Sequence, residues 1–265
     1  MKRLKLSRVF LSTCLASVLF ALGGCVTNEA GRSQLMLVSG KEEMQLGTAA
    51  FSQMKTNVPI SKDAKANDLV QRVGKRIAGV VNLPDAQWEF IVFESKEPNA
   101  FCLPGGKIGV YTGILPITKD EAGLATVLGH EVAHATLHHG AERMSRDYVR
   151  QGFSQGLSMA LSKQDPQVIT WSQTIFGAGV QLGEALPHSR DQESEADKMG
   201  LFYMARAGYN PEEAVGFWER FKAYNDKAGG SEGFWFLRTH PLDSKRIEDL
   251  KKLIPEAKAQ QKPAP

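Results

Sequence analysis

The sequence predicts an α+β fold that is mostly helical and contains a small β-sheet. Apolar residues recur at helical spacing in many segments, whereas only the stretches 88–93 and 107–112 alternate and are rich in β-forming residues. The chain has 265 residues and no internal repeat. This length is ample for one domain with a substantial core.

The first 24 residues have the features of an export signal. Four basic residues precede an apolar run at 9–22, and Gly23 and Gly24 stand directly before Cys25. The run is shorter than the roughly 20 residues of a membrane-spanning helix, which is typical of a secretory signal. The small pair before the cysteine resembles the lipobox of bacterial lipoproteins, which implies removal of residues 1–24 and acylation of Cys25. The alternative is a plain signal peptide with an incidental cysteine.

Removal of this signal would change the charge balance and the cysteine count. The whole chain has a net charge of +3, but the four basic residues of the signal leave 28 Lys and Arg against 29 Asp and Glu. We therefore expect no nucleic-acid partner. Cys14 would leave with the signal and Cys25 would carry lipid, so Cys102 has no partner for a disulfide within the chain, although it could pair between chains.

The remaining elements follow from helical periodicity and from start and stop signals. Thr118 followed by Glu121 predicts a capping box that opens a long helix ending near His139, with Gly140 as its stop. Polar residues within 168–186 favour a packing helix over a membrane span. The expected helices are 41–55, 69–81, 118–139, 141–162, 167–186, 191–207, 211–225 and 241–253.

The segments outside these elements are expected to be irregular. Residues 25–40 are expected to link the lipid anchor to the domain, and the domain itself to span 41–254. The Gly-rich stretch 226–233 predicts a mobile loop, and the composition of 255–265 predicts a disordered tail.

The strongest chemical signal is the motif His130-Glu131-Val132-Ala133-His134. Residues four apart on a helix share one face, so the imidazoles of His130 and His134 can bind one ion. Glu131 is placed to take a proton from water on that ion, whose pKa zinc lowers toward about 7. The alternative is surface decoration, but apolar flanking residues indicate a buried helix, where histidines without partners are costly.

A zinc site needs a third protein ligand, and a later acidic segment offers one. The inward face of its helix should include Ala196 and Gly200, and Glu193 and Asp197 fall on that face whereas Glu195 points away. We predict that Glu193 is the third ligand and that Asp197 orients a ligand histidine. The alternative is a solvated acidic face.

These motifs together resemble a known family. His130-x-x-x-His134, Glu193-x-x-x-Asp197 after Ser-Arg, and Thr-His240-Pro resemble the zinc metallopeptidases that include the CaaX prenyl protease, HtpX and the mitochondrial Oma protease. The resemblance covers about 41–253. It implies a zincin-like domain with one zinc per chain, bound by the two histidines and Glu193.

The same resemblance suggests roles for two further segments. Residues 99–101 and 105–112 resemble the family's edge strand beside the active-site helix, which could bind an extended substrate as an added strand; the alternative is an ordinary hairpin that closes the core. His240 would lie near the zinc, as a resting-state ligand or a group that stabilises the oxyanion; the alternative is a cap at a helix start. We expect His138 and His139, at a helix end, to be structural, and we leave open whether His188 lines the cleft.

The chain has no transmembrane segment after the signal, and it looks closest to soluble envelope lipoproteins of this family such as LoiP and BepA. The predicted function is therefore a zinc metalloendopeptidase on the periplasmic side of the bacterial outer membrane, anchored by lipid. Its expected substrates are unfolded or extended envelope proteins. The first alternative is an outer-membrane protein assembly or chaperone factor, linked to the assembly machinery, with latent protease activity. The second is a hydrolase of non-peptide envelope polymers, which the peptidase motif disfavours.

Overall fold

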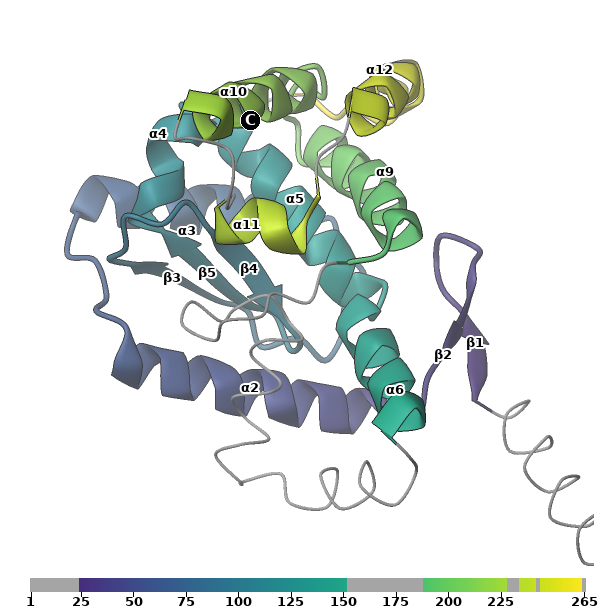
Figure 1. Cartoon of the computed structure of the whole chain (residues 1–265). Helices are drawn as coiled ribbons and strands as arrows, with labels where there is room; N and C mark the ends of the chain where they lie inside the picture. The colour runs from purple at the N-terminus through teal and green to yellow at the C-terminus, as the bar shows by residue number, and fades with distance from the viewer. Residues whose placement is uncertain (1–23, 152–187, 228–233, 242–243, 264–265) are drawn as a thin grey trace, which may run out of the picture.

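The computed structural model describes residues 24–151, 188–227, 234–241 and 244–263 (Figure 1). The predicted signal up to residue 23, the predicted helix 167–186, residues 152–162 of the helix before it and residues 228–233 lie outside these ranges. Within them, no helix has the length and apolar character needed to cross a membrane. The helices are α2 (Gly40–Asn57), α3 (Ala64–Ala78), α4 (Leu115–Thr118), α5 (Glu121–Thr136), α6 (His139–Gln151), α9 (Arg190–Arg206), α10 (Glu213–Lys227), α11 (Trp235–Thr239) and α12 (Ser244–Lys258), with a short 3-10 turn, η1 (Thr112–Ile114).

The main sheet has three strands, β3 (Glu89–Phe93), β4 (Ala100–Leu103) and β5 (Lys107–Tyr111), in the order β3-β5-β4. β5 pairs parallel with β3 and antiparallel with β4. The two strands predicted at 88–93 and 107–112 are confirmed, but β4 was not predicted as a strand of its own. β5 lies in the centre of the sheet, so the prediction that 105–112 belongs to an edge strand is wrong; the edges are β3 and β4.

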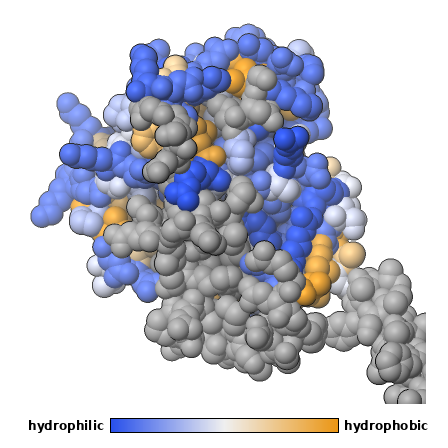
Figure 2. Space-filling view, in the orientation of Figure 1, coloured by the Kyte–Doolittle hydropathy of each residue, from blue (hydrophilic) through white to orange (hydrophobic). Residues whose placement is uncertain are grey.

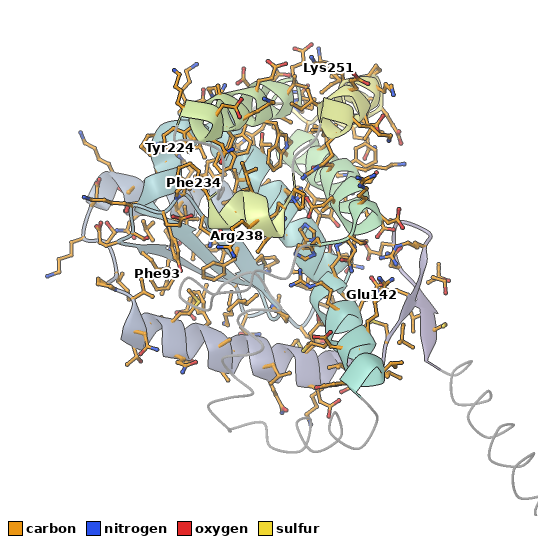
Figure 3. All side chains as sticks on the ribbon, viewed as in Figure 1. Phe93, Glu142, Tyr224, Phe234, Arg238 and Lys251 are labelled. Carbon is orange, nitrogen blue, oxygen red and sulfur yellow. The ribbon has the colours of Figure 1, made fainter. Side chains whose placement is uncertain are left out.

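Helices cover both faces of this sheet, which confirms the predicted α+β class (Figure 1). Alternation along β4 sends Ala100 and Cys102 into a core shared with α3, α5, α9 and α10. Phe101 and Leu103 point the other way, into a smaller core with α2 and α6. Phe93 of β3 belongs to that second core, between the sheet and α2 (Figure 3). The outer surface over α10 and α12 is mostly hydrophilic (Figure 2).

The long central helix begins and ends at other residues than the sequence suggested. Thr118 ends α4, and Asp120 is the N-cap of α5, its carboxylate accepting a hydrogen bond of 2.9 Å from the Gly123 N–H. The predicted capping box at Thr118 is therefore wrong. Gly140 is not a stop either, because it lies inside α6; the break falls at His138, whose φ is 54°. Its Nδ1 lies 2.7 Å from Glu43 on α2, which fixes the turn.

Residues 25–40, which were expected to form a linker, instead pack against the domain. β1 (Cys25–Thr27) and β2 (Ser33–Leu35) make an antiparallel hairpin. Gln34 donates a hydrogen bond of 3.0 Å to the Leu137 carbonyl, and the Leu37 N–H donates one of 2.8 Å to Ser145. At the other end of the chain, α12 continues to Lys258, so the first part of the tail predicted as disordered is helical.

Candidate metal centre

Helices α5 and α9 carry the candidate site and approach each other closely. Gly129 on α5 and Gly200 on α9 face one another: a Cβ added to Gly200 would lie 2.7 Å from the His130 backbone nitrogen. Neither position has room for a side chain, so the two backbones can pack almost in contact. This approach brings the motif of α5 against the acidic segment of α9.

Three side chains predicted as metal ligands meet at one point between these helices. The Nε2 atoms of His130 and His134 lie 3.1 Å apart, and the carboxylate oxygens of Glu193 lie 3.5 and 3.4 Å from them. All three residues are buried. Together with His240, each offers one ligand atom within 4.8 Å of the others.

The donor set fits a zinc ion, which proteins bind through imidazole nitrogens and carboxylate oxygens. Burial holds the pKa of His134 well below its ordinary value, which favours the neutral form that binds metal. Burial opposes ionisation of Glu193, but Arg246 and His240 hold its pKa well below its ordinary value. Burial also lowers the pKa of His130, yet contacts with Asp197 and Glu193 raise it to about 9, so a metal must displace a proton there.

Asp197 lies behind His130, where the sequence placed it. One of its oxygens is 3.0 Å from His130 Nδ1, on the opposite side of the ring from the shared Nε2 position. Arg246 of α12 binds both oxygens of Asp197, at 2.7 and 2.8 Å, and also lies 2.6 Å from Glu193. Arg246 was not among the predicted site residues, since 49 residues separate it from Asp197.

Glu131 and His240 face each other across the site. Glu131 is buried, and its Oε1 has no hydrogen-bond partner among the described residues. Burial raises the pKa of this carboxyl. His240 Nε2 is 3.4 Å from the same oxygen, whereas its Nδ1 lies 3.0 Å from Glu193 and 3.2 Å from His130 Nε2. His240 is thus a buried member of the cluster; its backbone also caps the end of α11, the His240 N–H donating a hydrogen bond of 2.8 Å to the Phe236 carbonyl, so it is not a cap at a helix start.

Two histidines beside His134 belong to the site's surroundings. His139 is completely buried and its Nδ1 lies 2.8 Å from His134 Nδ1. His139 was expected at the end of the long helix, but it begins α6, and burial lowers its pKa. The His188 ring lies 3.9 Å from that of His134, centroid to centroid. His188 also lines a cavity of about 450 Å³ that extends along Asp197 toward α12.

The site combines a buried helix that carries His-Glu-x-x-His, a carboxylate from a second helix at the same point, and a small sheet alongside. These features define a zincin-like metallopeptidase domain. Residues 64–254 match Peptidase family M48, and the chain belongs to this family.

Named relatives agree with this assignment. The chain is 40% identical over 190 residues to the mitochondrial metalloendopeptidase OMA1 of Schizosaccharomyces pombe, covering 71% of this chain and 53% of that protein. It is 31% identical over 246 residues to human OMA1, covering 86% and 45%. It is 26% identical over 227 residues to the beta-barrel assembly-enhancing protease of Escherichia coli, covering 84% and 46%. The chain thus spans about half the length of the curated relatives it matches.

Proposed function

We propose that this chain is a zinc-dependent metalloendopeptidase in which His130, His134 and Glu193 hold one zinc ion. The observation that carries the proposal is the convergence of two imidazole nitrogens and a carboxylate beside Glu131, whose buried oxygen has no hydrogen-bond partner among the described residues. Membership of Peptidase family M48 supports the same activity.

Each nearby side chain then has a chemical task. Zinc, when bound, would polarise the peptide carbonyl and lower the pKa of a water molecule. Glu131 would accept a proton from the attacking water and pass it to the leaving amine; burial raises the pKa of Glu131, which suits both transfers. Asp197 orients His130 so that its Nε2 faces the metal. His240 either stabilises the negative charge on the carbonyl oxygen or ligates the metal at rest.

The proposed substrates are extended segments of unfolded polypeptides. β4 pairs with β5 on one side only in the described part of the chain, and it lies at the edge of the sheet beside α5 (Figure 1). An edge strand can bind a peptide by backbone hydrogen bonds, with little demand on its sequence. A substrate bound there would run alongside the helix that carries Glu131.

The proposed location is the periplasmic face of a bacterial outer membrane, through lipid on Cys25. The support is the basic and apolar segment before this cysteine, together with the exposure of Cys25 at the start of β1. Some relatives are mitochondrial and others bacterial. Mass spectrometry of the purified N-terminus tests the proposal: a diacylglyceryl group on Cys25 is expected, and an unmodified residue there contradicts it.

A second candidate function is assembly of outer-membrane proteins, with proteolysis secondary or latent. The observation that favours it is the similarity to relatives named beta-barrel assembly-enhancing protease in Vibrio cholerae and Escherichia coli. If Glu131→Gln abolishes cleavage yet still rescues assembly in a deletion strain, this binding role is primary.

The central test compares the purified wild-type chain with Glu131→Gln for zinc content and casein cleavage. We expect one zinc per chain in both and cleavage only in the wild type, because Glu131 accepts a proton but does not hold the metal. Glu121→Gln is the matched control: Glu121 lies on the same helix, in its first turn, and pairs with Arg72. This control should cleave like the wild type. Absence of bound zinc in the wild type would overturn the proposal.

A further inference from the structure

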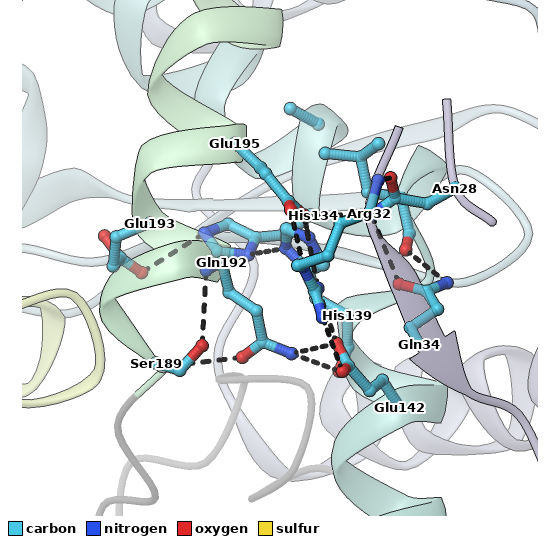
Figure 4. A network of polar contacts seen from close by, with 12 residues as sticks. Asn28, Arg32, Gln34, His134, His139, Glu142, Ser189, Gln192, Glu193 and Glu195 are labelled. Carbon is cyan, nitrogen blue, oxygen red and sulfur yellow. Dashed lines mark hydrogen bonds and ion pairs between the residues drawn. The ribbon is translucent and has the colours of Figure 1, made fainter. Parts of the chain in front are cut away.

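The two imidazoles of the candidate metal centre are supported in different ways. His130 has a carboxylate, Asp197, 3.0 Å from its Nδ1. Among the described residues, no carboxylate lies at Nδ1 of His134; the atom there is Nδ1 of His139, at 2.8 Å (Figure 4). A neutral imidazole carries one proton, and the partner of Nδ1 decides whether Nε2 is free to bind a metal. The orientation of the His134–His139 hydrogen bond therefore decides whether His134 can be a ligand.

Glu195 sets that orientation from the far side of His139. Its Oε2 lies 3.0 Å from His139 Nε2 (Figure 4). A carboxylate accepts hydrogen bonds, so His139 carries its proton on Nε2 and presents a lone pair at Nδ1. His134 must then donate from Nδ1, which leaves its Nε2 unprotonated and facing Glu193 and His130. The opposite orientation would put a proton on His134 Nε2 and block the metal.

Glu195 is held in place by the N-terminal hairpin. Arg32, at the start of β2, donates to Glu195 at 2.5 and 3.2 Å and to Glu142 of α6 at 2.7 and 2.8 Å. Asn28 donates a further hydrogen bond of 2.9 Å to Glu195. Arg32 thus holds the Glu195 carboxylate in place in the same way as Arg246 holds the Asp197 carboxylate. Residues 28 and 32 both precede the region that matches the family, which begins at residue 64.

We propose that His139, Glu195 and Arg32 are positioning residues that fix the metal-binding tautomer of His134, and that the N-terminal hairpin completes the metal centre from outside the family-matched region. The proposal rests on the proposed function, because it takes His134 as a zinc ligand. It gives residues 25–35 a role beyond tethering. A movement of the hairpin away from Glu195 would weaken metal binding without touching any ligand directly.

A purely structural role for the same contacts makes different predictions. An ion-pair network that only holds the hairpin to α6 and α9 would change stability when broken, but not the tautomer of His134 or its affinity for zinc. Contacts behind a metal ligand affect affinity by about 10- to 100-fold when removed. Tautomer and affinity therefore separate the two roles, whereas thermal stability does not.

The test uses Glu195→Gln and Arg32→Gln, with Arg146→Gln as the matched control. Arg146 also pairs with Glu142, at 2.5 Å, and its side chain is half exposed. The readouts are zinc affinity by chelator competition and the ¹⁵N signals of the His134 ring in the metal-free chain. We expect Nδ1–H alone in the wild type and the control, a tautomer mixture in Glu195→Gln and Arg32→Gln, and about 10-fold or more loss of affinity in these two.

Unchanged tautomer and affinity in folded Glu195→Gln and Arg32→Gln would overturn the proposal. If neither variant folds, Asn28→Ala takes their place, because it removes one hydrogen-bond donor to Glu195 and leaves the charges intact. A smaller shift in both the tautomer and the zinc affinity would support the proposal, and no shift in either would overturn it. Failure of the proposed function looks different. A wild-type chain that binds no zinc would refute the metal site. The ring signals of metal-free His134 would still report whether the contacts from Arg32 through Glu195 and His139 fix its tautomer.

Discussion

The contact between α5 and α9 makes a sharp prediction for the variant Gly200→Ala. A Cβ at residue 200 would lie 2.7 Å from the His130 nitrogen and 2.8 Å from the Gly129 carbonyl carbon. Ordinary van der Waals contacts begin near 3.4 Å. Both opposing atoms belong to the backbone of α5, so no side chain can turn aside. The helices must therefore separate by about 0.7 Å or distort locally.

Two opposing effects set the size of the change. Alanine is favoured over glycine inside a helix by about 1 kcal/mol. Overpacking of a tight contact costs about 1–3 kcal/mol, and the separated helices also lose packing around the glycine pair. We expect a net loss of about 1–2 kcal/mol in the free energy of unfolding. Glu193 moves away from His130 with α9, so zinc affinity should fall by about 10-fold or more, since site geometry tolerates about 0.5 Å.

Denaturant titration and chelator competition on the purified chain measure the two effects. Gly216→Ala is the matched control, because Gly216 also lies within a helix and its Cβ would meet the ends of two flexible side chains, Arg220 at 3.1 Å and Glu213 at 3.8 Å. This control should be stabilised by about 0.5–1 kcal/mol, with unchanged zinc affinity. Equal stability and equal affinity in Gly200→Ala and the wild type would refute the close-contact reasoning.

Three further predictions concern stability and reactivity. Burial opposes ionisation of Glu195, but hydrogen bonds from His139 and Arg32 lower its pKa from 4.5 to about 2. Its charge therefore stabilises the fold above pH 4.5, by about 2 kcal/mol after allowance for solvent screening. In urea titrations, the difference in the free energy of unfolding between the wild type and Glu195→Gln should shrink as the pH falls from 4.5 to 2. A difference that stays constant over this range would contradict the prediction. Asp120→Ala removes the N-cap of α5 and should lower the midpoint of denaturation by the equivalent of about 1 kcal/mol; an unchanged midpoint would show that the cap contributes nothing. Burial, followed by the charge of Glu131, raises the pKa of the Cys102 thiol, so a thiol reagent should modify Cys102 far more slowly in the native chain than in denaturant; equal rates would show that the thiol is accessible.

Local periodicity explains what could be predicted from the sequence. His130 and His134, and likewise Glu193 and Asp197, are four residues apart, so one helical turn places each pair on one face. The structure has each pair on a single helix and all four side chains buried. The two predicted strands follow from alternation in the same way.

Errors arose where neighbouring elements compete for the same residues. Thr118 and Asp120 both suit a helix start, and the choice of Asp120 depends on α4, which ends at Thr118 and makes a separate turn necessary. The order of the sheet could not be derived either, because strand pairing is a contact between separate segments; alternation is equally compatible with β5 at the edge or in the centre.

The sequence by itself indicated the chemical type of the centre, since the three proposed ligands His130, His134 and Glu193 lie in helical segments whose periodicity places them on inward faces. Only the tertiary structure decided what surrounds them. Arg246 meets Asp197 across 49 residues, and Arg32 meets Glu195 across 163. Such partners are selected by the packing of elements far apart in the chain, and the short-range periodicity of a sequence carries no information about that packing.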